Sequence, residues 1–154
     1  MQRRSYLNSQ KQKTQLITKK LYLPHSQNFA ITDSGFTNLK PILKSNYAEA
    51  KIIVENDNDA QIHIDGELVG SGKWQGRLEA GTHTIEARKI SHTTIQKEIK
   101  VKDGENLTHK MDNPKPIYGA LEISTTPNNA TVFIDDKKIG QTPFINNTIL
   151  VGQH

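Results

Sequence analysis

The sequence predicts an all-β fold: a small antiparallel β-sandwich module, present as a tandem repeat with an incomplete second copy. Three observations predict this fold class. Several segments alternate apolar and polar residues with a period of 2, as a strand with one buried face requires. These segments follow one another about every 8–12 residues, with Asp-Gly pairs or Pro between them. No segment has the 3.6-residue period of an amphipathic helix.

The composition excludes several classes of protein. The 154 residues include no cysteine, which excludes a disulfide scaffold, a thiol nucleophile and any Cys-ligated metal. No apolar run approaches the about 20 residues that a transmembrane helix needs. Residues 1–49 hold eight basic and two acidic residues, whereas residues 50–154 hold twelve and fourteen. The body of the protein therefore lacks the positive surface expected of a nucleic-acid-binding domain.

An internal repeat organises the chain. Residues 50–70 match residues 120–140 at an offset of 70, and a one-residue insertion then aligns a Gly-x-His in both copies. The matched pairs are Ile53 and Ile123, Ala60 and Ala130, Ile62 and Val132, Ile64 and Ile134, Asp65 and Asp135, Val69 and Ile139, Gly70 and Gly140, and His83 and His154. We therefore divide the chain into a basic segment 1–49, a complete module 50–112, a Pro-rich linker 113–118 and the N-terminal half of a second module, 119–154.

Each strand of the first module has its own signal. Residues 60–65 alternate, and Asp65-Gly66 then predicts a hairpin, because Gly accepts a positive φ at little cost. Alternation returns in three further segments, 84–88, 95–101 and 107–111. The second copy has Asp135-Asp136 at the hairpin, which favours a different turn type because Asp tolerates positive φ less well.

The second copy resembles the PEGA domain family. The resemblance rests on Pro127-Asn128-Asn129-Ala130, on the strand that ends at Asp135, and on Gly140-Gln141-Thr142-Pro143. The first copy departs from this pattern at Asp57, in place of Pro, and at Ser71-Gly72-Lys73-Trp74. The resemblance implies an accessory β module, often in tandem, of multidomain bacterial envelope or surface proteins. It implies a place in the periplasm or on the cell surface, and no catalytic residue or cofactor.

The second copy stops at the position of His83, so it lacks the equivalents of residues 84–111. A half-module of about 36 residues buries too little surface to fold alone, and its last strand would have an unpaired edge. We expect the chain to be a fragment of a longer protein. Its partners would be the other domains of that protein or other envelope proteins.

The basic N-terminal segment has two interpretations. Residues 29–33 resemble 99–103, residues 39–43 resemble 107–111, and Leu23-Pro24-His25 echoes Ile90-Ser91-His92, which indicates the eroded tail of a preceding copy. That tail could also complete the truncated second copy. The alternative is an unrelated linker with a weakly ordered terminus, or a basic arm for phosphate or anionic lipid. Arg3-Arg4 is not followed by the apolar core of a secretory signal.

One segment suggests a binding site. Trp74, Arg77 and Glu79, taken to lie on one face, would form a platform for carbohydrate or peptidoglycan. In the alternative interpretation Trp74 is an apolar anchor of the sandwich, like Phe144 at the corresponding place in the second copy.

The other polar residues that could form a catalytic or metal site are better explained as parts of turns or strands. The six His do not cluster, and we expect His83 and His154 to bond a neighbouring backbone group at a strand start. Asp65 and Asp135 are explained by hairpin turns. The acidic run 55–59 fails the EF-hand spacing for Ca²⁺. The sequence thus predicts no catalytic residue, metal site or cofactor, and it favours a module that spaces, displays or docks neighbouring domains.

Overall fold

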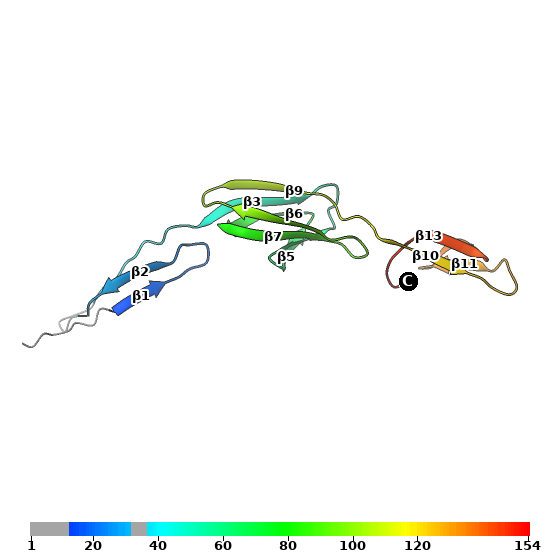
Figure 1. The fold of residues 1–154 in the computed structure, drawn as a ribbon, viewed down its shortest axis with the longest axis horizontal. Coiled ribbons are helices and arrows are strands. Elements are labelled where there is room, and N and C mark those ends of the chain that lie inside the picture. Colours follow the sequence, from blue (N-terminus) through cyan, green and yellow to red (C-terminus); the bar gives the residue numbers. More distant parts are fainter. Residues whose placement is uncertain (1–12, 32–36) are drawn as a thin grey trace, which may run out of the picture. The chain divides into compact units, whose positions relative to one another are not determined.

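The computed structural model describes residues 13–31 and 37–154 (Figure 1). Every regular element among these residues is a β-strand, which confirms the all-β class. The strands are β1 (Lys13–Ile17), β2 (His25–Phe29), β3 (Tyr47–Val54), β4 (Gln61–Ile64), β5 (Glu67–Ser71), β6 (Lys73–Glu79), β7 (Gly81–Arg88), β8 (Ile95–Val101), β9 (Asn106–Met111), β10 (Tyr118–Ile123), β11 (Thr131–Ile134), β12 (Lys137–Gln141) and β13 (Phe144–Leu150).

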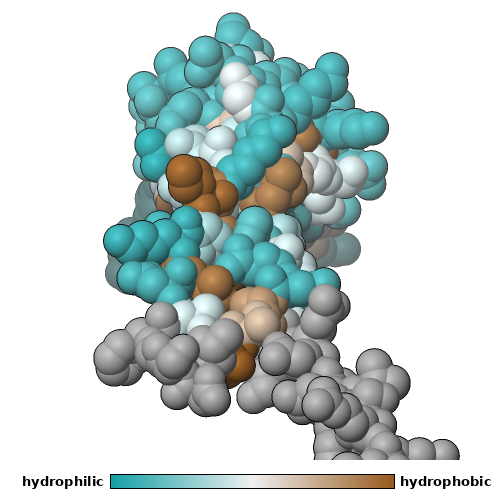
Figure 2. All heavy atoms as spheres, turned by 90° about the vertical axis from the view of Figure 1, so that its left-hand side faces the viewer, coloured by the Kyte–Doolittle hydropathy of each residue, from teal (hydrophilic) through white to brown (hydrophobic). Residues whose placement is uncertain are grey.

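The chain forms two compact units. The first comprises the described residues up to Ala50, with Gly76–Gly81 and Lys100–Leu107. The second comprises Lys51–Gln75, Thr82–Ile99 and Thr108–His154. Figure 2 shows one face of the molecule, on which most coloured side chains are hydrophilic and the hydrophobic ones form small separate areas. This surface agrees with the mean hydropathy of −0.65.

The first unit begins with an antiparallel hairpin. β1 and β2 pair from Lys13 opposite Phe29 to Ile17 opposite His25. The connecting turn is closed by a hydrogen bond from the Tyr22 N–H to the Lys19 carbonyl, 3.1 Å. Residues 39–43, which resemble a strand of the complete module in sequence, form no strand. Asp33, part of another resemblance, lies outside the described residues.

Seven strands form one sheet in the order β8-β7-β4-β5-β6-β3-β9. β4 is antiparallel to both β5 and β7, and a single residue pair, Ser71 opposite Lys73, joins β5 to β6. The strands have a sandwich-like arrangement. β9 departs from the expected antiparallel pattern. The N–H of Glu49 donates to Glu105, and the N–H of Glu55 to Met111, so the partner number rises along both strands and β9 runs parallel to β3.

Alternating side chains of these strands form the core. In the first unit the buried apolar residues are Ala48, Ala50, Leu78 and Val101. In the second unit Ile52, Ile62 and Ile85 are completely buried, and each such side chain stabilises the fold by about 1.5–3 kcal/mol. The period-2 pattern in the sequence therefore corresponds to true burial on one face of each strand.

Residues 118–154 form two two-stranded antiparallel sheets, β10 with β13 and β11 with β12. β12 and β13 are not joined, since Pro143, at the position of Lys73 in the first module, has no N–H to donate. The pairing of β10 with β13 shifts register between Gly119 and Leu121. The side chain of Asn146 closes this irregularity by accepting hydrogen bonds from the N–H and hydroxyl of Thr148, both 2.7 Å. The one-residue insertion read from the sequence lies here.

The two hairpins that follow the repeated alanine have the same register. In β4 and β5 the pairs are Gln61–Ser71, Ile62–Gly70, His63–Leu68 and Ile64–Glu67, with a bulge after Ile62. In β11 and β12 every pair and the bulge recur 70 residues later. Asp135 and Asp136 both have positive φ (49° and 62°), as do Asp65 and Gly66 (51° and 86°). The expectation of a different turn type in the second copy was therefore wrong.

The strand that precedes each of these two hairpins does not repeat at the offset of 70 residues that relates the hairpins themselves. The buried side chains of β3 include Ile52 at 0% exposure, whereas Ile53 is half-buried. In β10 the inward positions are Gly119, Leu121 and Ile123. Ile123 therefore corresponds to Ile52 and not to Ile53, which corrects the alignment at a constant offset of 70. The first module has one extra residue between this strand and Ala60.

Candidate functional site

The candidate platform of Trp74, Arg77 and Glu79 does not share one face. Along β6, Trp74 is half-buried on the side of the buried Leu78, while Arg77 and Glu79 are exposed on the opposite side. The alternation of a strand makes this separation unavoidable, because positions 74 and 77 differ by an odd number. The structure brings Arg77 and Glu79 to one face and places Trp74 on the other.

Arg77 instead joins two residues of β3. Its Nε lies 2.9 Å from the Glu49 Oε1, and its guanidinium lies 4.6 Å from the centre of the Tyr47 ring. The hydrogen bond to Glu49 raises the pKa of Arg77. Both charged side chains are about half exposed (54% and 53%), so the pair contributes little to stability. This cluster ties β6 to β3 at the surface.

Trp74 packs against a glycine. A Cβ built on Gly70 would lie 3.9 Å from the Trp74 side chain. In the second module Phe144 covers Gly140 more tightly, with a built Cβ only 2.7 Å from the ring. The two aromatic residues occupy corresponding positions and lie over corresponding glycines. These contacts favour the anchoring interpretation of Trp74.

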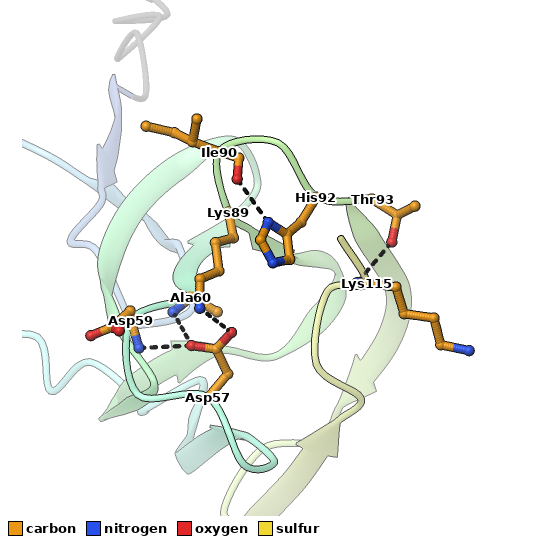
Figure 3. Close-up of polar contacts among 8 residues, drawn as sticks. All are labelled: Asp57, Asp59, Ala60, Lys89, Ile90, His92, Thr93 and Lys115. Carbon is orange, nitrogen blue, oxygen red and sulfur yellow. Dashed lines mark hydrogen bonds and ion pairs between the residues drawn. The ribbon is translucent and has the colours of Figure 1, made fainter. Parts of the chain in front are cut away.

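Asp57 organises the turn that leads into β4 (Figure 3). Its Oδ1 accepts hydrogen bonds from the N–H groups of Asp59 and Ala60, 3.0 and 3.1 Å, and its Oδ2 lies 2.7 Å from the Lys89 Nζ. The Asp57 side chain is only 8% exposed. The Lys89 hydrogen bond, together with the two backbone donors, outweighs burial and lowers the pKa of Asp57. The acidic run 55–59 thus uses its central carboxylate internally.

The second module replaces this carboxylate by a hydroxyl. Thr142, 2% exposed, accepts a 3.1 Å hydrogen bond from the Ala130 N–H through its Oγ1. Its hydroxyl also bonds that of Thr125, which in turn donates to the Pro127 carbonyl. Thr142 belongs to the Gly-x-Thr-Pro motif, so this contact gives the motif a structural role.

Each module also has a histidine–aspartate pair. The Nδ1 of His83 lies 2.6 Å from Asp65, and the Nδ1 of His154 lies 2.9 Å from Asp135. We expected both histidines to bond a neighbouring backbone group, and at His154 the structure shows such a bond, to the Leu150 carbonyl at 2.7 Å. In each module the carboxylate at the hairpin turn therefore also binds a histidine 18 or 19 residues later in the chain. We had assigned these carboxylates a role in the turn alone.

These pairs shift pKa values in opposite directions. Burial raises the pKa of Asp65, but hydrogen bonds from His83 and the Thr84 N–H outweigh it, and the net shift is downward. The hydrogen bond to Asp135, with that to Leu150, raises the pKa of His154. Each pair has a single carboxylate and a single imidazole. Within the part of the chain that the structure describes, no three His, Asp or Glu side chains gather as metal ligands.

The connection between the two modules has a defined geometry. His92 forms an isolated antiparallel bridge with Pro116, and the Thr93 N–H donates to the Lys115 carbonyl, 2.8 Å. The Thr93 hydroxyl accepts from the Lys115 N–H, 3.1 Å (Figure 3). Beside it lies an open cavity of about 630 Å³, lined by Lys89, Ile90, His92 and other residues up to Leu150. Ile90 is 91% exposed at this cavity.

Sequence reasoning missed the contacts of Lys89 and Thr142 and the connection between the modules. Lys89 and Thr142 act through contacts with residues 32 and 12 positions away, and no local pattern reveals such pairs. The connection depends on backbone groups, which have no sequence signature. The repeated Gly-x-His motif, in contrast, was a usable signal for the histidine–aspartate pairs.

No helical segment among residues 13–31 and 37–154 has the length and apolarity needed to span a lipid bilayer. No curated protein and no solved structure matches the chain. The PEGA domain family matches residues 118–154. This segment contains the hydrogen bond from the Ala130 N–H to Thr142 and the His154–Asp135 pair. This C-terminal part of the chain therefore belongs to the PEGA domain family.

Proposed function

We propose that this chain is a run of PEGA-like β modules from a larger bacterial envelope or surface protein, and that it acts as a non-catalytic spacer that displays or docks neighbouring domains. One observation carries the proposal: two connections along the chain use the same set of backbone hydrogen bonds. Residues 13–49 then correspond to the tail of a preceding module, residues 50–112 to a complete one, and residues 119–154 to the start of the next.

The first connection lies between the N-terminal hairpin and β3. Its donors and acceptors are Tyr22 to Lys19, Leu23 to Lys44, Asn46 to Leu21 and Ala80 to Asn46, at 2.9–3.1 Å. The second connection has His92 to Lys89, Thr93 to Lys115, Ile117 to Ser91 and Val151 to Ile117, at 2.8–3.1 Å. Each donor in the second set follows its counterpart by 70 or 71 residues. Leu21 and Ser91, at the same place in the two turns, both have positive φ (68° and 62°).

This arrangement suits a spacer. Backbone hydrogen bonds do not depend on side-chain identity, so successive modules with different sequences can use the same connection. Each of these hydrogen bonds contributes about 0.5–1.5 kcal/mol to stability, and each connection has four of them. Pro114 is fully buried, and Pro116 restricts the linker further. These features would hold consecutive modules in a fixed relation, which a display or docking element needs.

The experiment measures how rigid the connection is. The chain lacks cysteine, so Glu67→Cys with Lys137→Cys places two spin labels at exposed hairpin residues of the two modules. We expect pulsed electron paramagnetic resonance to give a narrow distribution of the distance between the two labels. A control variant with four Gly inserted after Asn113 should give a broad one. An equally broad distribution in the parent chain would refute a fixed spacer.

A further inference from the structure

The seven-stranded sheet has a long edge at β8. This strand stands at one end of the sheet and, among the described residues, pairs only with β7. The backbone N–H and C=O groups that it turns away from β7 can therefore bond a strand of another chain. β8 has seven residues and contains no proline, so neither a short length nor a missing donor limits such pairing. An edge of this kind needs another protection against association.

The outward side chains of β8 do not supply this protection. They are Gln96, Glu98 and Lys100, and all three are exposed. If the β8 strands of two copies paired antiparallel with Ile99 opposite Ile99, Glu98 of each copy would lie opposite Lys100 of the other. Each such pair of opposite charges stabilises the strand pairing by about 0.2–1 kcal/mol. The outward face of β8 therefore favours pairing with a second copy of the chain.

The inward face of β8 contains a charged residue. Ile95, Lys97, Ile99 and Val101 alternate onto this face. Ile99 and Val101 are buried, as core residues should be, whereas Lys97 is exposed. The ammonium group of Lys97 thus stays in contact with water in the single chain, although the residue belongs to the row that forms the core.

The effect of Lys97 on His109 supports this position. His109 lies on β9, the strand at the other end of the same sheet, in an inward row with Leu107 and the buried Met111. Burial and the positive charge of Lys97 both lower the pKa of His109. The Nε2 of this histidine is buried and has no hydrogen-bond partner among the described residues. Both edge strands therefore have a basic residue in the inward row.

Pairing of two β8 edges would remove Lys97 from water. A strand added beside β8 extends the sheet, so the inward rows of the two copies would form one continuous core. Burying an ammonium group without a counter-charge costs several kcal/mol. In the register with Ile99 opposite Ile99, each Lys97 would lie opposite Val101 of the other copy, which has no charge to offer. The pairs of Glu98 with Lys100 offset only a small part of this cost.

From these observations we propose that Lys97 guards the β8 edge: its charge in the inward row prevents two copies of the chain from joining their sheets through this strand. The role concerns association between chains, so it goes beyond the proposed spacer function and does not depend on it. Antiparallel pairing of two identical strands is two-fold symmetric, so loss of the guard should give a closed dimer.

Lys97→Ile tests the proposal, and Lys100→Ile is the matched control. Both variants replace an exposed lysine of β8 by isoleucine, but only the first changes the inward face. We expect Lys97→Ile to dimerise at a protein concentration at least tenfold lower than the control and the parent chain, measured by analytical ultracentrifugation. Association through any other surface is common to the three proteins and leaves this comparison unchanged.

Amide hydrogen exchange locates the contact. The β8 amides that point away from β7 should exchange at least tenfold more slowly in the Lys97→Ile dimer than in the Lys100→Ile protein. Three results would overturn the proposal: equal association of the two variants, a dimer without protection in β8, or growth of Lys97→Ile beyond twice the mass of the control.

A second pair of variants tests the position of Lys97 without creating an apolar edge. Lys97→Gln should raise the pKa of His109, followed by NMR of its imidazole ring, because the positive charge that lowers this pKa is removed. Lys100→Gln should leave the pKa of His109 unchanged, since residue 100 faces outward. An equal pKa of His109 in Lys97→Gln and the parent chain would show that Lys97 lies away from the inner face, and the proposal would fail.

Discussion

Asp57 and Thr142 make the same hydrogen bond in the two modules: each side chain accepts the backbone N–H of the repeated alanine, Ala60 or Ala130, at 3.1 Å. The acceptor comes from the residue three positions before Ala60 in one module and from twelve positions after Ala130 in the other. The two departures of the first module from the PEGA pattern are therefore linked. Gly72 stands where Thr142 supplies a hydroxyl, and Asp57, where Pro127 stands, supplies the acceptor instead.

This relationship makes Asp57 a strong determinant of stability in the first module. Asp57→Ala removes the cap of Ala60 and the acceptor for Lys89, so the N–H groups of residues 59 and 60 lose their partner. We expect the free energy of unfolding to fall by about 2 kcal/mol, measured by urea denaturation. Asp59→Ala keeps every acceptor of the turn and should change stability by less than about 0.5 kcal/mol. Equal effects of the two substitutions would contradict the capping role.

Gly72 should tolerate no side chain. Its φ is +63°, and a Cβ there would lie 2.6 Å from the Asn58 Cα and 2.7 Å from the Asn58 carbonyl oxygen. Both are backbone atoms, so relief requires the turn itself to move. We expect Gly72→Ala to cost about 3 kcal/mol or more in thermal or urea unfolding.

Gly66→Ala is the matched control for this substitution. Gly66 also has a positive φ (+86°), but no atom lies within 4 Å of a Cβ built there. In Gly66→Ala the free energy of unfolding should therefore fall by about 1 kcal/mol, from backbone strain alone. A Gly72→Ala protein no less stable than Gly66→Ala would show that the turn can adapt.

The sequence was informative where the physics is local. Period-2 alternation located the inward residues of β4, and Asp65-Gly66 located a turn, because each depends on neighbouring residues alone. It failed for the parallel pairing of β9 with β3, since strand direction depends on the path of the chain between them. It also failed for Trp74 and Arg77, which were assigned to one face although strand geometry places them on opposite faces. The partner of Asp57 could not be predicted, because Lys89 is 32 residues away.

Acid should weaken the first module through Asp57 and Asp65. The pKa values of both carboxyl groups are lowered in the folded chain from an ordinary value of 3.8. Between each folded pKa and 3.8 the unfolded chain binds more protons than the folded chain, so stability falls as pH falls. The stabilisation is fully present well above pH 3.8 and is lost as the pH drops through the folded values.

A pH series of urea denaturation curves tests this expectation. The loss of stability below about pH 4 should be smaller in Asp57→Asn, whose residue 57 no longer titrates. Glu67→Gln is the control, because Glu67 is exposed beside the turn of the β4–β5 hairpin. If Asp57→Asn keeps the full acid sensitivity of the parent chain, the lowered pKa of Asp57 does not contribute to stability.

Replacing Gly140 by alanine should destabilise the protein more than replacing Gly70, because Phe144 covers Gly140 more tightly than Trp74 covers Gly70. A Cβ on Gly140 would lie 2.7 and 3.0 Å from atoms of the Phe144 ring, so Gly140→Ala must displace that ring. The corresponding Cβ on Gly70 would approach the Lys73 carbonyl to 3.4 Å and Trp74 to 3.9 Å, which are ordinary contacts. We expect Gly140→Ala to cost about 1–3 kcal/mol and Gly70→Ala less than about 1 kcal/mol. The change at Gly140 is best followed by proton NMR of the Phe144 ring, and Trp74 fluorescence reports the change at Gly70. An unmoved Phe144 ring in Gly140→Ala would show that the aromatic anchor of the second module packs elsewhere.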